Sequence, residues 1–150
     1  MKRITHFLAH QSCPVVDGIV FSDATIQLFE VSATWAPRYK FEIQKAAITS
    51  IAELEAKGEL YWAGCGILDN YTANERALKV VCGEGSYGND GFIAVINLAT
   101  WHTMWIAYFT SSNPFCKVSL EQDQVVAMST YDCIWKFDLN KPANVEILCL

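Results

Sequence analysis

A glycine pattern typical of phosphate-binding loops occurs at Gly83-Glu84-Gly85-Ser86-Tyr87-Gly88. It follows an apolar run, residues 77–82, that predicts a strand. A dinucleotide site needs a helix next, with its N-terminus facing the pyrophosphate, whereas here Asn89-Asp90-Gly91 and a second apolar run follow. A kinase-type loop needs a lysine on the next strand, and residues 92–98 contain none. We therefore interpret the segment as a glycine-rich turn between strands.

Histidines and cysteines are the other candidates for catalysis or metal binding. His6 and His10 are four residues apart, but no carboxylate or cysteine accompanies them at ligand spacing. His102 has the chemistry of a base for a cysteine nucleophile, yet no local signature supports such a pair. The six cysteines are spread singly, so we expect buried free thiols, not zinc ligands or disulfides. The sequence therefore predicts no catalytic residue, no metal site and no cofactor.

The densest group of acidic and aromatic residues lies at 67–90, which we interpret as an insertion loop. Acids interleaved with tyrosines suit a basic cleft, because charge steers association and rings anchor it. An ordinary solvated loop is the alternative. Two tryptophans just past strand ends are candidates for exposed anchors or sugar-stacking platforms. The residues predicted to bind a partner are Asp69, Asn70, Tyr71, Glu75, Glu84, Tyr87, Asp90, Trp35 and Trp101.

Three apolar segments that must form strands end alike, with an aromatic residue or Ile, then an acid or amide, then a branched aliphatic residue. They are residues 25–31, 92–98 and 133–139. The last two begin 41 residues apart (133 minus 92), which is close to the period of about 40 to 45 residues typical of propeller blades. We therefore expect antiparallel four-strand units at about 1–43, 44–110 with the insertion at 67–90, and 115–150.

One segment, residues 45–57, carries conflicting signals. The repeat predicts a strand there, but Ile48, Ile51 and Leu54 form a helical stripe and Gly58 follows as a terminator. A short helix near 45–57 is the interpretation we favour. It makes the second unit a decorated, non-standard blade.

The segment 115–150 resembles a blade of a WD-repeat or quinoprotein-type β-propeller. Phe137-Asp138 stands where the WD dipeptide would be, as do Ile96-Asn97 and Phe29-Glu30 in the other copies. The resemblance implies a mainly β fold, either a three-unit propeller-like arrangement or an open β-sandwich. Three units leave two sheet edges uncovered, which a homodimer closing a six-bladed ring would cover.

Composition limits the function. The chain has 150 residues, 52% of them apolar and 18% charged, which fits one all-β domain with a substantial core. A net charge of −5 argues against nucleic acid and fits a basic protein partner. Residues 91–116 carry no charge, but polar residues at their centre favour a hairpin over a membrane span. The start does not read as a secretory signal, so we expect a cytoplasmic protein.

These features together predict a non-enzymatic protein-binding module. In function class the chain resembles small bacterial toxin-immunity proteins, which implies an immunity protein or antitoxin covering the active site of a basic toxin such as a nuclease. The alternative is a small-molecule or carbohydrate-binding protein that uses Trp35 and Trp101.

Overall fold

The computed structural model describes residue 7 and residues 10–35 and 37–150, which form antiparallel sheets with one short α-helix. The strands are β1 (Ser12–Val15), β2 (Gly18–Phe21), β3 (Thr25–Thr34), β4 (Lys40–Ser50), β5 (Tyr61–Gly64), β6 (Gly66–Ala73), β7 (Leu78–Glu84), β8 (Gly91–Asn97), β9 (His102–Phe109), β10 (Phe115–Glu121), β11 (Gln124–Ser129), β12 (Cys133–Asp138) and β13 (Val145–Cys149). The helix α2 spans Ile51–Ala56, and a 3-10 turn, η1, spans Asn74–Arg76.

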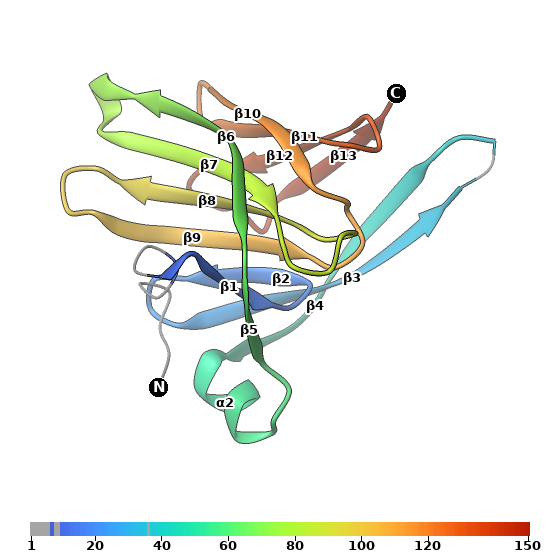
Figure 1. Ribbon diagram of the computed structural model, residues 1–150, viewed down its shortest axis with the longest axis horizontal. Helices are drawn as coiled ribbons and strands as arrows, with labels where there is room; N and C mark the ends of the chain where they lie inside the picture. Colours follow the sequence, from blue (N-terminus) through green and yellow to red (C-terminus); the bar gives the residue numbers. More distant parts are fainter. Residues whose placement is uncertain (1–6, 8–9, 36) are drawn as a thin grey trace.

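The strands form two large sheets and one small one (Figure 1). The first has seven strands in the order β4-β3-β2-β9-β8-β7-β6. The second is a meander of four strands in chain order, β10-β11-β12-β13. Strands β1 and β5 pair separately. The long β3–β4 hairpin projects beyond the rest of its sheet (Figure 1).

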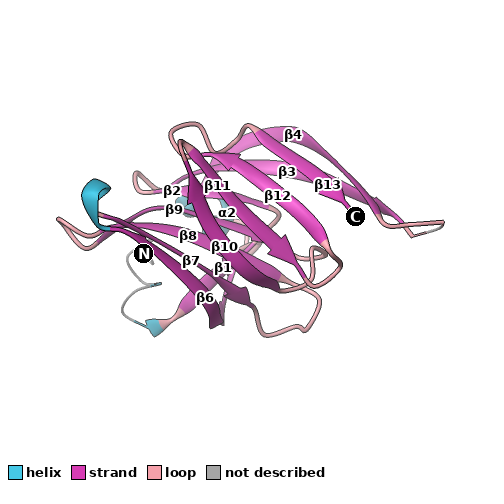
Figure 2. Ribbon diagram, turned by 90° about the horizontal axis from the view of Figure 1, so that it is seen from above, coloured by secondary structure: helices cyan, strands magenta, loops and turns pink. Residues whose placement is uncertain are grey.

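The four-stranded sheet stacks on one face of the seven-stranded sheet (Figure 2). Alternate residues of each strand point toward the other sheet, and the residues that do so are apolar and largely aromatic. Phe109 and Trp105 of β9 meet Trp135 and Phe137 of β12, with centroids 4.7 Å apart for Phe109 and Trp135 and 5.8 Å for Trp105 and Phe137. All four rings are buried.

The opposite face of the seven-stranded sheet carries a second core. Its central strands contribute Val81, Phe92 and Ile106, each almost completely buried. Covering them are the β1–β5 pair, Phe7 and the helix α2, whose Ile51 and Leu54 belong to the same cluster. The fold therefore has three layers, and the seven-stranded sheet lies in the middle.

The helix α2 is short because both of its ends are specified locally. Ser50 caps the N-terminus by accepting a hydrogen bond from the backbone N–H of Glu53. At the other end, the N–H of Gly58 bonds to the carbonyl of Glu55 and that of Glu59 to the carbonyl of Leu54, the Schellman arrangement. Gly58 has a φ of +67°, which glycine adopts without steric cost.

The mainly β, antiparallel fold with one short helix near 45–57 is confirmed, but the helix spans only Ile51–Ala56, and residues 45–50, with Ile48 of the predicted stripe, belong to β4. The strands stack as sheets instead of forming a ring of blades, and the division into three units differs from the observed sheet order. Only the last unit, 115–150, forms its own four-stranded sheet; strands of the first two merge through pairing of β2 with β9. The predicted insertion loop at 67–90 is wrong, because β6, η1 and β7 occupy most of it.

The cysteines also differ in part from expectation. Cys133 and Cys149, which lie opposite each other on β12 and β13, form a disulfide. The other four are free thiols: Cys13, Cys65, Cys82 and Cys116. The pairing register of β12 and β13 brings the two cysteines together, and this register could not be predicted from the sequence alone.

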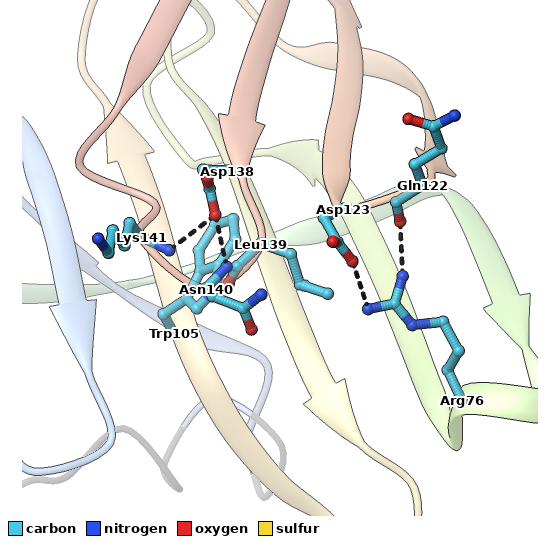
Figure 3. Close-up of polar contacts among 8 residues, drawn as sticks. All are labelled: Arg76, Trp105, Gln122, Asp123, Asp138, Leu139, Asn140 and Lys141. Carbon is cyan, nitrogen blue, oxygen red and sulfur yellow. Dashed lines mark hydrogen bonds and ion pairs between the residues drawn. The ribbon is translucent and has the colours of Figure 1, made fainter.

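Polar contacts join turns of the four-stranded sheet to the seven-stranded sheet (Figure 3). The guanidinium of Arg76 donates to the carbonyl of Gln122 and, at 2.8 Å, to the carboxylate of Asp123. The indole Nε1 of Trp105 donates to the carbonyl of Leu139 at 3.1 Å. These bonds fix where the four-stranded sheet lies on its neighbour.

No helix in the described part of the chain has the length and apolarity needed to cross a membrane.

The indole bond between the sheets gives a stability prediction. Trp105→Phe leaves the buried carbonyl of Leu139 without its donor, so we expect unfolding free energy to fall by roughly 1 to 3 kcal/mol in urea titrations. Trp101→Phe is the matched control, because Trp101 is 63% exposed, and it should change stability by less than about 0.5 kcal/mol. Equal effects of the two substitutions would contradict this role of the bond.

Candidate functional site

The residues predicted to bind a partner do not form one surface. Along β6, successive side chains point to opposite faces, so Asp69 and Tyr71 lie toward the four-stranded sheet and Asn70 lies away from it. Glu75 sits in η1 at one end of β7, whereas Glu84 ends that strand at the other. The exposed Tyr87 belongs to the β7–β8 loop that follows Glu84. The seven-residue β7 therefore separates the predicted acids.

Asp69 has a structural role. Its carboxylate accepts a hydrogen bond of 2.9 Å from the backbone N–H of Val118 on β10. It thereby joins the edge of the seven-stranded sheet to the edge of the four-stranded one. Burial and the charge of Asp69 raise the pKa of the neighbouring Cys82 thiol to about 12.

Asp90 is buried, so its assignment to a partner surface is wrong. The Tyr108 hydroxyl donates to its carboxylate Oδ2, while Oδ1 has no partner among the described residues. A Cβ on Gly85 would clash with both groups, so only glycine fits beside the pair. Burial raises the pKa of Tyr108, and the bond to Asp90 adds to the shift. This pair fixes the β7–β8 loop internally.

Trp35 belongs to an exposed aromatic cluster at the end of the β3–β4 hairpin. Its ring lies 5.1 Å from Tyr39 and 5.2 Å from Tyr131, and Tyr39 and Tyr131 are 4.7 Å apart. We call Trp35, Tyr39 and Tyr131 the aromatic cluster. Because Tyr131 lies between β11 and β12, the cluster ties the hairpin to the four-stranded sheet.

Trp101 lies far from this cluster. It occupies the β8–β9 turn with a φ of +56° and is 63% exposed. That turn and the end of the β3–β4 hairpin are at opposite sides of the molecule (Figure 1). A single small ligand therefore does not contact Trp35 and Trp101 together.

The outer face of the four-stranded sheet carries apolar residues that sequence reasoning missed. Met128, Ile134 and Leu148 stand side by side on β11, β12 and β13 and point away from the core. We call these three residues the outer apolar row. Leu148 is 63% exposed, and the other two are half-buried. The available signal was that outward positions of these strands are apolar, whereas a solvated face is normally polar.

Two hollows extend this row toward the seven-stranded sheet. One, of about 290 Å³, lies beside Asp69 and includes Met128 and Ile134 in its lining. The other, of about 250 Å³, lies between Arg38–Phe41 of the hairpin and Ile147–Cys149. Because Tyr39 and Leu148 both line the second hollow, the aromatic cluster and the outer apolar row form one continuous surface.

The candidates for catalysis are not assembled into a site. Cys13 and Cys82 are buried, and His102 is exposed at the start of β9. Burial raises the pKa of the Cys13 thiol, and its hydrogen bond with Cys65 adds to the shift. No cluster of three or more metal-ligating side chains occurs among the described residues. His6 lies outside those residues, so whether His6 and His10 come together at a metal site is untested.

No protein family model matches this chain, and no curated protein matches it.

The thiols give a reactivity prediction. A raised pKa leaves less thiolate at neutral pH, so Cys13 and Cys82 should resist iodoacetamide at pH about 8 in the folded protein. Cys65 and Cys116 are half-exposed and should be labelled first. Peptide mass spectrometry with and without urea measures this order. Rapid labelling of Cys82 in the folded state would overturn its assignment as an inert core residue.

Proposed function

We propose that this protein is a non-enzymatic protein-binding module that contacts its partner through the outer apolar row and the aromatic cluster. The observation that carries the proposal is the alignment of Met128, Ile134 and Leu148 across three strands of a solvent-facing sheet. Contiguous apolar surface on a solvent-facing sheet is a common mark of a protein-binding site.

The two parts of this surface suit different tasks. Leu148 has apolar area to bury on binding, and complete burial of such a side chain is worth about 1.5 to 3 kcal/mol. Trp35 and Tyr39 are large rings already held against each other, so they lose little freedom when a partner covers them. Together they have the composition of a protein interface, with aromatic anchors beside aliphatic contacts.

The burial of candidate catalytic side chains supports the non-enzymatic part of the proposal. Cys13 and Cys82, two of the candidate nucleophiles, are buried. A nucleophile or base must reach its substrate, and burial works against that.

The most concrete form of the proposal is an immunity protein or antitoxin that covers the active site of a basic toxin. Its support is the net charge of −5, which accelerates association with a basic partner. The expected cytoplasmic location stays part of this proposal. The Cys133–Cys149 disulfide argues against the cytoplasmic location, because disulfides persist mainly in oxidising compartments.

A second candidate, carbohydrate binding, rests on Trp35 alone. Its ring is 50% exposed and stands against two tyrosines, which is a surface on which a sugar face can stack. Quenching or a shift of tryptophan fluorescence by glycans, lost in Trp35→Ala, would support it.

Replacing the outer apolar row tests the protein-binding proposal. The double variant Ile134→Lys/Leu148→Lys places charge where the partner needs apolar contact, so affinity should fall at least about tenfold. Partners retained by immobilised wild-type protein from source-cell extract are identified by mass spectrometry, purified and titrated by calorimetry.

Ile48→Lys is the matched control, because Ile48 is 74% exposed on β4 and outside the outer apolar row. It should bind like wild type, and unfolding curves should show all three proteins folded. Undiminished affinity of the double variant would contradict the proposal. A purified partner that is a basic enzyme, inhibited on binding, would support the antitoxin form.

A further inference from the structure

The four edges of the two large sheets are protected unequally. Edge strands invite pairing with other chains, and bulges or charges normally prevent it. Strands β4, β6 and β10 each contain a bulge, where the register with the neighbouring strand shifts. Strand β13 pairs with β12 without any shift and carries one charge, Glu146. Among the described residues, β13 is therefore the unprotected edge.

The edge strand β10 is also covered by a specific side-chain bond. On β10, the outward N–H of Val118 is satisfied by Asp69. Strand β4 runs close to β13, and Lys45 donates to the Asn144 side chain just before it, but no side chain bonds to the backbone of β13 among the described residues.

The hydrogen-bond pattern shows which groups of β13 face outward. At one end of β13, the N–H of Leu150 bonds to the carbonyl of Asp132, and at the other the N–H of Asp138 bonds to the carbonyl of Asn144. Bonded residues alternate along an antiparallel strand, so the even-numbered residues of β13 bond to β12. The backbone groups of the odd-numbered residues face the open edge. These residues are Val145, Ile147 and Cys149.

This edge is accessible. On β12 the inward side chains, such as Trp135 and Phe137, are completely buried. On β13 the inward side chains of Val145, Ile147 and Cys149 are only half-buried. The hollow of about 250 Å³ next to Ile147 and Cys149 has room for one or two side chains of an added strand.

The charge around this hollow is positive. Arg38 and Lys40 line it, and no acidic residue does. Lys40 pairs with Glu42 at 3.3 Å, but Arg38 makes no ion pair or hydrogen bond with any described residue. A partner segment that carries carboxylates beside apolar residues would complement both the charge and the aromatic wall formed by Tyr39 and Phe41.

We propose that β13 accepts an extended segment of a partner protein as an added strand, and that this segment alternates apolar with acidic residues. The inference rests on the general protein-binding function, not on its antitoxin form, and specifies how the partner docks. Backbone bonds to Val145, Ile147 and Cys149 hold the segment, apolar side chains enter the hollow, and a carboxylate meets Arg38.

A second copy of this chain is a poorer occupant of the same edge. A two-fold contact through β13 presents the same patch on both copies. It would bring Arg38 and Lys40 of each copy near their equivalents, and like charges close together repel. An acidic peptide has no such penalty.

Two synthetic nine-residue peptides test the proposal on the full chain. One alternates valine with aspartate, and the other has lysine at every aspartate position; both have blocked ends and a fluorescent label. Anisotropy should show about tenfold tighter binding of the aspartate peptide. Hydrogen exchange by NMR should show new protection of the amides of Val145, Ile147 and Cys149. An aspartate peptide N-methylated on the bonding edge should not bind.

The charge part is tested by Arg38→Glu, which should abolish or reverse the preference for the aspartate peptide. Lys57→Glu, at the exposed end of α2, is the matched control and should leave it unchanged. Both variants carry the same charge change.

Absence of peptide binding, or equal binding of both peptides without protection of the β13 amides, would overturn the proposal. A free protein that sediments as a dimer with those amides already protected would also overturn it, because a second copy would then occupy the edge. These failures leave the proposed function standing if Ile134→Lys/Leu148→Lys still loses its partner. The proposed function would be refuted separately, by a double variant that binds the partner as tightly as wild type does.

Discussion

Trp135 lies at the centre of the contact between the two large sheets, completely buried, and the arrangement of the other strands follows from its position. Its ring packs against Phe109 from β9, Phe115 from β10 and Phe41 from β4, with centroids between 4.7 and 5.8 Å away. Burying a cluster of this size requires an element on each side of it, and here the two stacked sheets supply them. It places β12 over the middle of the seven-stranded sheet and leaves β10 and β13 at the margins.

The two edge strands of the four-stranded sheet, β10 and β13, have different surroundings. At the β10 margin, Asp69 supplies a carboxylate to the outward N–H of Val118, and bulges disturb both edge strands. At the β13 margin, a disulfide ties β13 to β12 and strand β4 runs close by, but no described backbone group bonds to the outer edge of β13. The exposed Leu148 and the aromatic cluster border the same margin. Apolar surface and unpaired backbone therefore coincide, which is the basis for assigning partner binding to this side.

The sequence predicts what depends on local alternation. The four strands of 115–150 follow from alternating apolar residues and turn residues. The helix α2 follows from the spacing of Ile51 and Leu54 and from Gly58 as its terminator. The prediction fails where distant pairing decides. The β2–β9 contact joins segments far apart in the chain, and β6 reads as a polar loop because it is a bulged edge strand. Asp90 likewise reads as a loop acid, although Tyr108, 18 residues later, holds it in the core.

The open edge of β13 is the central claim, and native-state hydrogen exchange of the free protein tests it most directly. Protection should alternate along the strand: the amides of Glu146 and Leu148, which bond to β12, should exchange slowly, and those of Val145, Ile147 and Cys149 should exchange rapidly. The amide of Val118, capped by Asp69, should exchange slowly although β10 is also an edge. Uniform protection along β13 would contradict the account.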